Sequence, residues 1–380
     1  MVIAPDSFKG SLSSPEVAAA IERGWMQGAP GSACHRVPLA DGGEGTVQAL
    51  VDATGGRLET RTVTGPLGEP VEAHFGILGG DGPLTAVVEV AAASGLTLLP
   101  VADLDAGRAT SYGTGELIAA ALDLGVRRIV LGLGGSACTD GGAGLVQALG
   151  VRLRDQRGGE IGSGGAALGD LARVELDGVH PGLAGCTVVA ACDVDNPLTG
   201  PRGAAAVFGP QKGAAPDLVE QLDRHLAHLV SVLADGGVEV DPALPGCGAA
   251  GGIGFAVLAL LGGSLRPGIE IVAEAVGLDA LLDRAELVIT GEGQMDAQSL
   301  AGKVPVGVLR RARRRGVPVI ALAGSLGDGV EEILDAGMTA ALSVTRGVVS
   351  LDEALDGAAA NLEATARALA AVWRAGARRS

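Results

Sequence analysis

The chain has 380 residues, of which 47% are hydrophobic and only 2% aromatic, and its formal net charge is −16. This length suits two domains of ordinary size, and a core of Ala, Val and Leu with many glycines favours an α/β protein over a β-sandwich. The negative charge excludes nucleic acids and anionic membranes as partners, because both are bound by clustered Lys and Arg.

The cysteines and the N-terminus bear on where the protein resides. The five cysteines contain no Cys-x-x-Cys pair, so they indicate neither a disulfide framework nor a zinc site, and we expect a cytoplasmic protein. The first residues, MVIAPDSFKG, lack the basic and apolar regions of a secretory signal. The uncharged segment 242–265 is interrupted by prolines and glycines, so we expect no membrane helix there.

The two ends of the chain alternate short apolar strands with helices. The strands are expected at 2–4, 37–39, 287–290, 317–323 and 340–344. The helices are expected at 13–25, 46–52, 304–315, 329–336 and 351–374. Apolar strands with little alternation, separated by helices, predict a parallel sheet that is covered on both faces.

The middle of the chain has a different pattern. The runs 57–63, 71–78 and 84–90 alternate apolar and polar residues, with the turn GPLGEP between the first two, and predict an antiparallel meander. We therefore expect a two-domain α/β protein. Residues 1–56 and 262–380 would form a discontinuous Rossmann- or flavodoxin-like parallel-sheet domain, and residues 57–261 an inserted mixed α/β domain. Strands at 127–133 and 187–192 fit either sheet.

One ten-residue segment occurs twice. Residues 41–50 read DGGEGTVQAL and residues 140–149 read DGGAGLVQAL, which is identity at eight of ten positions. Coincidence between two Ala-rich helix starts also explains the match, since nothing extends it. In either case an Asp after a strand, then Gly-Gly and a helix start, offers a carboxylate and exposed N–H donors to a ligand.

Lysine is rare in this sequence. Only three of the 28 basic residues are lysines, namely Lys9, Lys212 and Lys303, and each adjoins a glycine in SFKGS, PQKGA and AGKVP. Because arginine supplies the other cations, these lysines are candidates for phosphate contact in glycine-lined loops. The alternative is that two of them are ordinary loop lysines.

The segment TGEGQMDAQSLAGK (290–303) follows an apolar strand. Its carboxylates Glu292 and Asp296 lie where parallel sheets bind ligands, and Lys303 directly precedes a helix. Carboxylates that bind Mg²⁺ beside a lysine that binds phosphate predict phosphoryl transfer. Capping of a helix start is the alternative role for each carboxylate. The segment is not a Walker A loop, because Ala297 and Val304 replace its Gly and its Ser or Thr.

Two further polar segments interrupt apolar sequence. ACDVDNPLTG (191–200) ends a strand with Asp193, a candidate general base, and FGPQKGA (208–214) contains Gln211 and Lys212. GLGGSA (132–137) also follows a strand, so a dinucleotide site is a minor alternative. His225 and His228 are three residues apart on a predicted helix, but without a third ligand we do not expect a metal there.

Seven motifs occur in the order VIAPDSFKGSLS, PLADGGEGT, GLGGSACTDGGAG, CDVDNPLTG, FGPQKGA, GCGAAGGIG and TGEGQMDAQSLAGKVP. In order and spacing they resemble the bacterial glycerate kinases of the first type, over nearly the whole chain. The resemblance implies transfer of the γ-phosphoryl group of ATP to D-glycerate with Mg²⁺, giving 2-phosphoglycerate or 3-phosphoglycerate. It also implies a two-domain α/β fold with the site between the domains.

The charge of ATP and glycerate suggests how the roles are divided. Lys9, Lys212, Lys303, Mg²⁺ and helix N-termini would gather the anions, Asp193 would be the base with Asp296 next, and Asp41, Glu292 and Asp296 would contact Mg²⁺. The expected contacts to substrate or phosphate are Asp6, Ser7, Asp41, Gly42, Gly43, Gly134, Gly135, Ser136, Asp140, Gly141, Asn196, Gln211, Glu292 and Ser299.

The chain departs from the family pattern in one loop. Members usually read Gly-Gly-Ser-Ala-Thr-Asn-Asp, where this chain has Cys138 and Thr139 before Asp140. If that asparagine contacts substrate, Thr139 would weaken or alter the contact.

The alternative functions are a non-catalytic sensor of an organic acid or nucleotide and a kinase of a related short hydroxy acid. Whether the chain forms a homodimer stays open.

Overall fold

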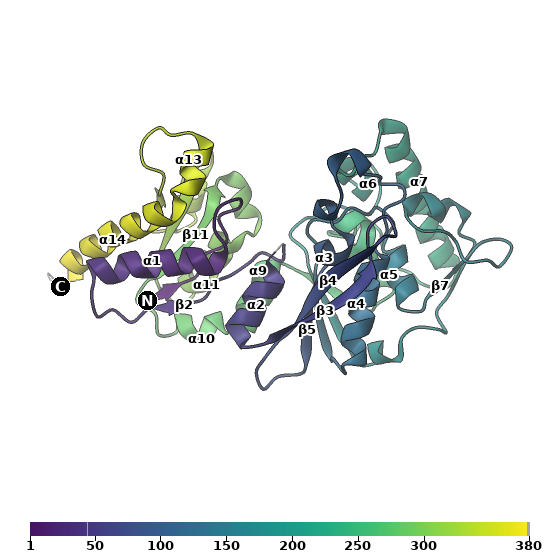
Figure 1. The fold of residues 1–380 in the computed structure, drawn as a ribbon, viewed down its shortest axis with the longest axis horizontal. Helices are drawn as coiled ribbons and strands as arrows, with labels where there is room; N and C mark the ends of the chain where they lie inside the picture. The colour runs from purple at the N-terminus through teal and green to yellow at the C-terminus, as the bar shows by residue number, and fades with distance from the viewer. Residues whose placement is uncertain (44, 378–380) are drawn as a thin grey trace. The chain divides into compact units, whose positions relative to one another are not determined.

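The computed structural model of the chain describes residues 1–43 and 45–377 (Figure 1). Its contacts divide it into two compact units. Unit 1 comprises Met1–Asp41 and the chain from Ile269 onward, and unit 2 comprises Gly42–Gly268. The division falls before helix α2 (Thr46–Thr54) rather than after it as predicted, because Val47 and Val51 of α2 pack closely on Gly76 in the sheet of unit 2.

Unit 1 contains a five-stranded sheet made from both ends of the chain. Its strands are β1 (Val2–Ile3), β2 (His35–Arg36), β11 (Val288–Met295), β12 (Val319–Leu326) and β13 (Ala340–Ser343). They lie in the order β13-β12-β11-β1-β2, and every neighbouring pair is parallel, which confirms the predicted parallel sheet. Numbered along the chain this is the 2-1-3-4-5 order of flavodoxin-like sheets, whose switch point lies between β1 and β11.

The helices of unit 1 are α1 (Ser14–Gly28), α9 (Gly268–Ala275), α10 (Leu278–Leu282), α11 (Val304–Arg313), α12 (Val330–Asp335), α13 (Leu351–Asp356) and α14 (Ala358–Ala377). Helices α1 and α14, from opposite ends of the chain, lie side by side (Figure 1). Their backbones approach so closely that a Cβ atom at Gly24 would overlap the carbonyl oxygen of Glu363. Together they cover the sheet face that carries Ile3, Ile289 and Ile320.

Unit 2 contains a mixed six-stranded sheet. Its strands, in spatial order, are β10 (Ser264–Arg266), β9 (Thr187–Ala191), β6 (Arg128–Gly132), β5 (Thr85–Glu89), β4 (Pro70–Ile77) and β3 (Arg57–Thr64). Strands β3, β4 and β5 pair antiparallel, which confirms the predicted meander, whereas β5, β6, β9 and β10 pair in parallel. Strands β6 and β9, which fitted either sheet, therefore belong to unit 2. A separate hairpin pairs β7 (Arg152–Arg154) with β8 (Arg173–Glu175).

The remaining helices of unit 2 are α3 (Val90–Ser94), α4 (Tyr112–Asp123), α5 (Ala143–Ala148), α6 (Ala204–Phe208), α7 (Pro216–Asp235) and α8 (Ile253–Ala259). They bury a core that includes Phe75 of β4, Leu117 of α4 and Ile129 of β6. None of the helices in the described part of the chain is both long and apolar enough to cross a membrane.

Several predicted bounds differ from the observed ones, and three of these differences change the description of unit 1. Strand β11 continues through polar sequence to Met295, because it pairs with β12 along its whole length, so Glu292 lies within the strand. The predicted strand 37–39 is observed as β2 at His35–Arg36, although the amides of Val37 and Leu39 extend the pairing to β1. The predicted helix 351–374 is two helices, α13 and α14, interrupted at Gly357.

Candidate active site

Three carboxylates of unit 1 gather at the switch point of its sheet. Asp6 follows β1, and its N–H continues the strand pairing by donating to the Gly291 carbonyl at 2.8 Å. Asp41 ends the segment that follows β2, and Glu292 lies in β11. The strand order reverses between β1 and β11, and this crevice is where open parallel sheets bind ligands.

The Asp6 carboxyl is strongly perturbed. Its side chain is buried, and its Oδ1 accepts a hydrogen bond from the Ser7 N–H at 2.6 Å. Burial raises the pKa of Asp6 to about 7, and the carboxylates of Asp41 and Glu292 contribute to the rise, while the Ser7 N–H and the Lys9 ammonium oppose it. The repulsion from Asp41 and Glu292 thus favours the protonated form of the Asp6 carboxyl.

Glu292 links this cluster to Lys303. Its side chain is buried, Oε1 accepts a hydrogen bond from the Ser299 hydroxyl at 2.5 Å, and Oε2 lies 3.4 Å from the Lys303 Nζ. Burial raises the pKa of Glu292, and Ser299 and Lys303 counteract this effect. Lys303 is the N-cap residue of α11 and is partly exposed, so its ammonium also remains accessible to an anion.

Asp296 has the capping role that the sequence left as the alternative. It precedes the short 3₁₀ helix Ala297–Ala301, and its Oδ1 accepts the Gln298 N–H at 2.9 Å. Its Oδ2 accepts from the Gln294 Nε2 at 3.0 Å, and its own N–H donates to the Ser299 hydroxyl. Both carboxylate oxygens of Asp296 therefore already accept hydrogen bonds, and its predicted role as base and metal ligand stays a prediction.

Lys212 of unit 2 is buried beside the loop that follows β6. Its Nζ donates to the Ser136 hydroxyl at 2.9 Å and to the Cys138 carbonyl at 2.6 Å. Burial lowers the pKa of Lys212, and the nearby carboxylate of Asp140 partly offsets this effect. The ammonium is thus bound by a hydroxyl and a carbonyl oxygen rather than by a direct ion pair, and its predicted contact with phosphate stays a prediction.

Asp140 organises this loop from the inside. Its fully buried carboxylate accepts hydrogen bonds from the N–H and hydroxyl of Ser111, each at 2.8 Å, and from the N–H groups of Gly142 and Gly144. It therefore ties the start of α5 to the start of α4. The contact that it was predicted to make with substrate stays a prediction.

The Thr139 side chain, at the departure from the family pattern, is fully buried. Its Oγ1 has no hydrogen-bond partner in the part of the chain that the structure describes. The neighbouring Cys138 contributes its carbonyl to Lys212. In this structure Thr139 thus lies in the packed interior of the loop.

The remaining predicted residues lie on loops and strand ends. Asp193 lies two residues after the end of β9, and its Oδ1 accepts the Gly268 N–H at 3.0 Å. Asn196 donates through Nδ2 to the Arg202 carbonyl at 2.8 Å, whereas Gln211 is exposed. The backbones of Gly42 and Gly141, with φ of 92° and 65°, adopt the left-handed conformation that favours glycine, and a Cβ atom there would overlap Ala191 or Leu229. Their predicted contacts with a ligand stay predictions. Five other predicted contacts are exposed or partly exposed: Ser7, Lys9, Gly43, Gly134 and Gly135.

Comparison with known proteins places the chain in a family. The profile of the Glycerate kinase family matches residues 1–374. The glycerate kinase of Bacillus subtilis (strain 168) is 50% identical over 371 residues, which are 98% of this chain and 97% of that protein. The glycerate 2-kinase of Escherichia coli (strain K12) is 49% identical over 379 residues, covering 100% and 99%.

The chain belongs to the glycerate kinase family. A crystal structure of a candidate glycerate kinase 2 from Salmonella typhimurium LT2 also aligns, with a TM-score of 0.88 and 50% identity over 99% of this chain and 98% of that one. This membership makes the chain an enzyme of the kinase class, and it implies that the enzyme uses ATP.

The oxygen donors of this kinase suit Mg²⁺ better than a soft metal. In residues 1–43 and 45–377, no group of three or more His, Cys, Asp or Glu side chains is arranged to hold a metal ion. Mg²⁺ does not need such a cage, because it is usually held by one or two carboxylates together with water and substrate phosphates. The repulsion that Asp41 and Glu292 exert on Asp6 is of the kind that a divalent cation relieves.

Sequence analysis missed two buried residues that position the loops of this kinase. Ser111 holds Asp140 and also accepts the N–H of Leu145, and nothing in its surroundings in the sequence singles it out. Glu89, at the end of β5, accepts the N–H of Val47 at 2.8 Å and so fixes the start of α2. The sequence does single out Glu89, because it is the one charged residue in the apolar run TAVVEVAAA (85–93).

Proposed function

We propose that this kinase transfers the γ-phosphoryl group of ATP to D-glycerate. Family membership and full-length relatives named as glycerate kinases support the substrate pair. The observation that carries the proposal is the cluster of Asp6, Asp41 and Glu292 beside Lys303, since it joins carboxylates suited to Mg²⁺ with a cation suited to phosphate. The Escherichia coli relative is named a glycerate 2-kinase, which favours 2-phosphoglycerate over 3-phosphoglycerate as the product.

The residues would have the following roles in phosphoryl transfer. A hydroxyl oxygen of glycerate attacks the γ-phosphorus, the bond from phosphorus to the ADP oxygen breaks, and the hydroxyl proton passes to a carboxylate, for which Asp193 is the first candidate and Asp296 the second. Lys9, Lys212 and Lys303 stabilise the phosphate oxygens.

Mg²⁺, when bound, would neutralise phosphate charge, and Asp41 and Glu292 would hold it. Asp296 is the third proposed ligand, and Asp6, whose carboxyl is repelled by Asp41 and Glu292, is a further candidate.

Several further assignments belong to this proposal. Contacts to substrate or phosphate are assigned to Asp6, Ser7, Asp41, Gly42, Gly43, Gly134, Gly135, Ser136, Asp140, Gly141, Asn196, Gln211, Glu292 and Ser299. Unit 1 would be the Rossmann- or flavodoxin-like domain, with the strand order β13-β12-β11-β1-β2 as its support. We also propose that the enzyme is cytoplasmic, with a homodimer as its candidate assembly.

The purified protein, mixed with ATP, Mg²⁺ and D-glycerate, tests the proposal. ADP release that depends on glycerate, with a single phosphoglycerate signal in the phosphorus NMR spectrum, would support it and would identify the hydroxyl that is phosphorylated. Tartronate and hydroxypyruvate, supplied separately, test whether a related short hydroxy acid is preferred. Binding of glycerate or ATP by calorimetry without any ADP release would instead favour the sensor.

A further inference from the structure

A cavity lies in unit 1, at the amino ends of strands β1, β2 and β11. Its volume is about 430 Å³, and its lining includes Val2, His35 and Leu287 from these strand ends. Parallel strands place their amino ends at the edge opposite to their carboxyl ends. The cavity is therefore separate from the cluster of Asp6, Asp41 and Glu292, and its volume is within the range of small-molecule sites.

The lining of the cavity includes both tryptophans of the chain. Trp25 comes from α1 and Trp373 from α14, and in a protein with 2% aromatic residues both line this one cavity. Trp25 is buried, and its Nε1 has no hydrogen-bond partner in the described part of the chain. Indole faces bind planar rings, so two tryptophans in the lining of one cavity favour a ligand with an aromatic ring.

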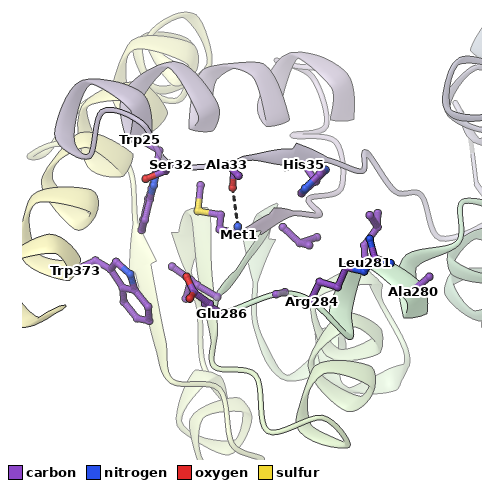
Figure 2. Close-up of a pocket in the computed structure, with 13 residues that line it drawn as sticks. Met1, Trp25, Ser32, Ala33, His35, Ala280, Leu281, Arg284, Glu286 and Trp373 are labelled. Carbon is purple, nitrogen blue, oxygen red and sulfur yellow. Dashed lines mark hydrogen bonds between the residues drawn. The ribbon is translucent and has the colours of Figure 1, made fainter. Parts of the chain in front are cut away.

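The other end of the cavity carries Arg284. Figure 2 shows both tryptophans at one end, Arg284 at the other, and Met1 and Glu286 between them. Within residues 1–43 and 45–377 Arg284 forms no ion pair, whereas nearby acids of unit 1 already pair with other arginines: Arg311 with Asp279, and Arg315 with Asp279 and Asp283.

We propose that this cavity binds a small aromatic or heteroaromatic anion. Its ring would contact Trp25 and Trp373, and its single carboxylate or phosphate group would pair with Arg284. Glu286, which also lines the cavity, would repel a second anionic group placed beside it. No residue of the proposed kinase mechanism lines this cavity.

Tryptophan emission of the full-length protein reports on this cavity directly, since both tryptophans line it. Benzoate and AMP, titrated separately at low ionic strength, represent an aromatic carboxylate and a heteroaromatic monophosphate. We expect a saturable change in emission with at least one of them. Arg284→Gln should weaken that probe by about threefold to tenfold, as expected for an exposed ion pair at low salt. The matched control is Arg310→Gln, an exposed arginine of α11 outside the cavity.

The responses to benzoate and AMP distinguish a carboxylate ligand from a phosphate ligand. Saturation by benzoate alone supports a carboxylate ligand, saturation by AMP alone supports a phosphate ligand, and saturation by both supports the shared chemistry. Trp373→Phe should reduce the amplitude of the change, and Arg284→Gln should leave glycerate-dependent ADP release as it is. The inference is overturned if neither probe changes the emission saturably, or if Arg284→Gln and Arg310→Gln respond alike.

Discussion

Lys303, which pairs with Glu292, is proposed to stabilise phosphate charge, whereas Asp193 is proposed to act as the base. Loose transition states in phosphoryl transfer depend more on charge and position than on base strength. We expect Lys303→Met to lower kcat/KM by roughly 10²- to 10³-fold, and Asp193→Asn to lower it by less. Steady-state kinetics with glycerate and ATP measure both effects.

A control distinguishes catalysis from folding at this pair. Lys303→Met leaves the buried Glu292 carboxylate without its cation, which destabilises the fold. Adding Glu292→Gln should restore the free energy of unfolding but not the activity. A larger loss in Asp193→Asn than in Lys303→Met would contradict this division of roles.

The buried hydroxyl of Thr139 allows a prediction about the free energy of unfolding. Valine has nearly the same shape and removes the unpaired Oγ1, so Thr139→Val should raise the free energy of unfolding by about 1 kcal/mol. Thr114→Val is the matched control, since Thr114 is equally buried but donates to the Ser94 hydroxyl at 2.9 Å, and its loss should lower stability. Urea denaturation compares the two, and destabilisation by both would show that Thr139 has a partner.

The raised pKa of Asp6 predicts a pH dependence of stability. The folded-state pKa of about 7 exceeds the ordinary aspartate value of 3.8, so the contribution of Asp6 to the free energy of unfolding is complete below pH ~4 and is lost as the pH rises through the folded pKa. Asp6→Asn should therefore have nearly wild-type stability in acid and exceed it by roughly 2–4 kcal/mol above neutral pH. Urea denaturation across this range checks the sign, and a constant difference between the two proteins would refute it.

At the scale of elements, the contact of α1 with α14 depends on glycine. A Cβ atom at Gly24 would overlap the backbone of Glu363, so Gly24→Ala should destabilise the protein by about 1–3 kcal/mol. Gly376→Ala, in α14 with open space around it, should instead stabilise slightly, because alanine favours the helix. Thermal unfolding of the two variants should give shifts of opposite sign, and equal shifts would argue against the close contact.

The elements also show where local sequence patterns reach their limit. The meander β3 to β5 was predictable because alternation of apolar and polar residues is a local property of half-buried strands. The length of β11 was not, because glycines and polar residues over 291–295 resemble a loop. They are strand because β12 offers a backbone partner along the whole segment, and that partner is not visible locally.

On the scale of the whole molecule, the functional class was more predictable than the site. The order and spacing of seven motifs pointed to the glycerate kinases, and the family profile matches residues 1–374. The roles of single residues were harder to read. Asp296 and Asp140 have the same chemistry as Asp6 in the sequence, yet both are engaged in capping and loop hydrogen bonds.

The sequence by itself determined the alternation of strands and helices, the antiparallel segment and the family, since these depend on hydrophobic period and on motifs that are continuous in the chain. The tertiary structure decided which charges meet. Lys212 reaches Ser136 across 76 positions of sequence, and Asp6 is coupled to Glu292 because β1 pairs with β11. Such proximity follows from strand order, and burial there changes the pKa values of the carboxyl and ammonium groups.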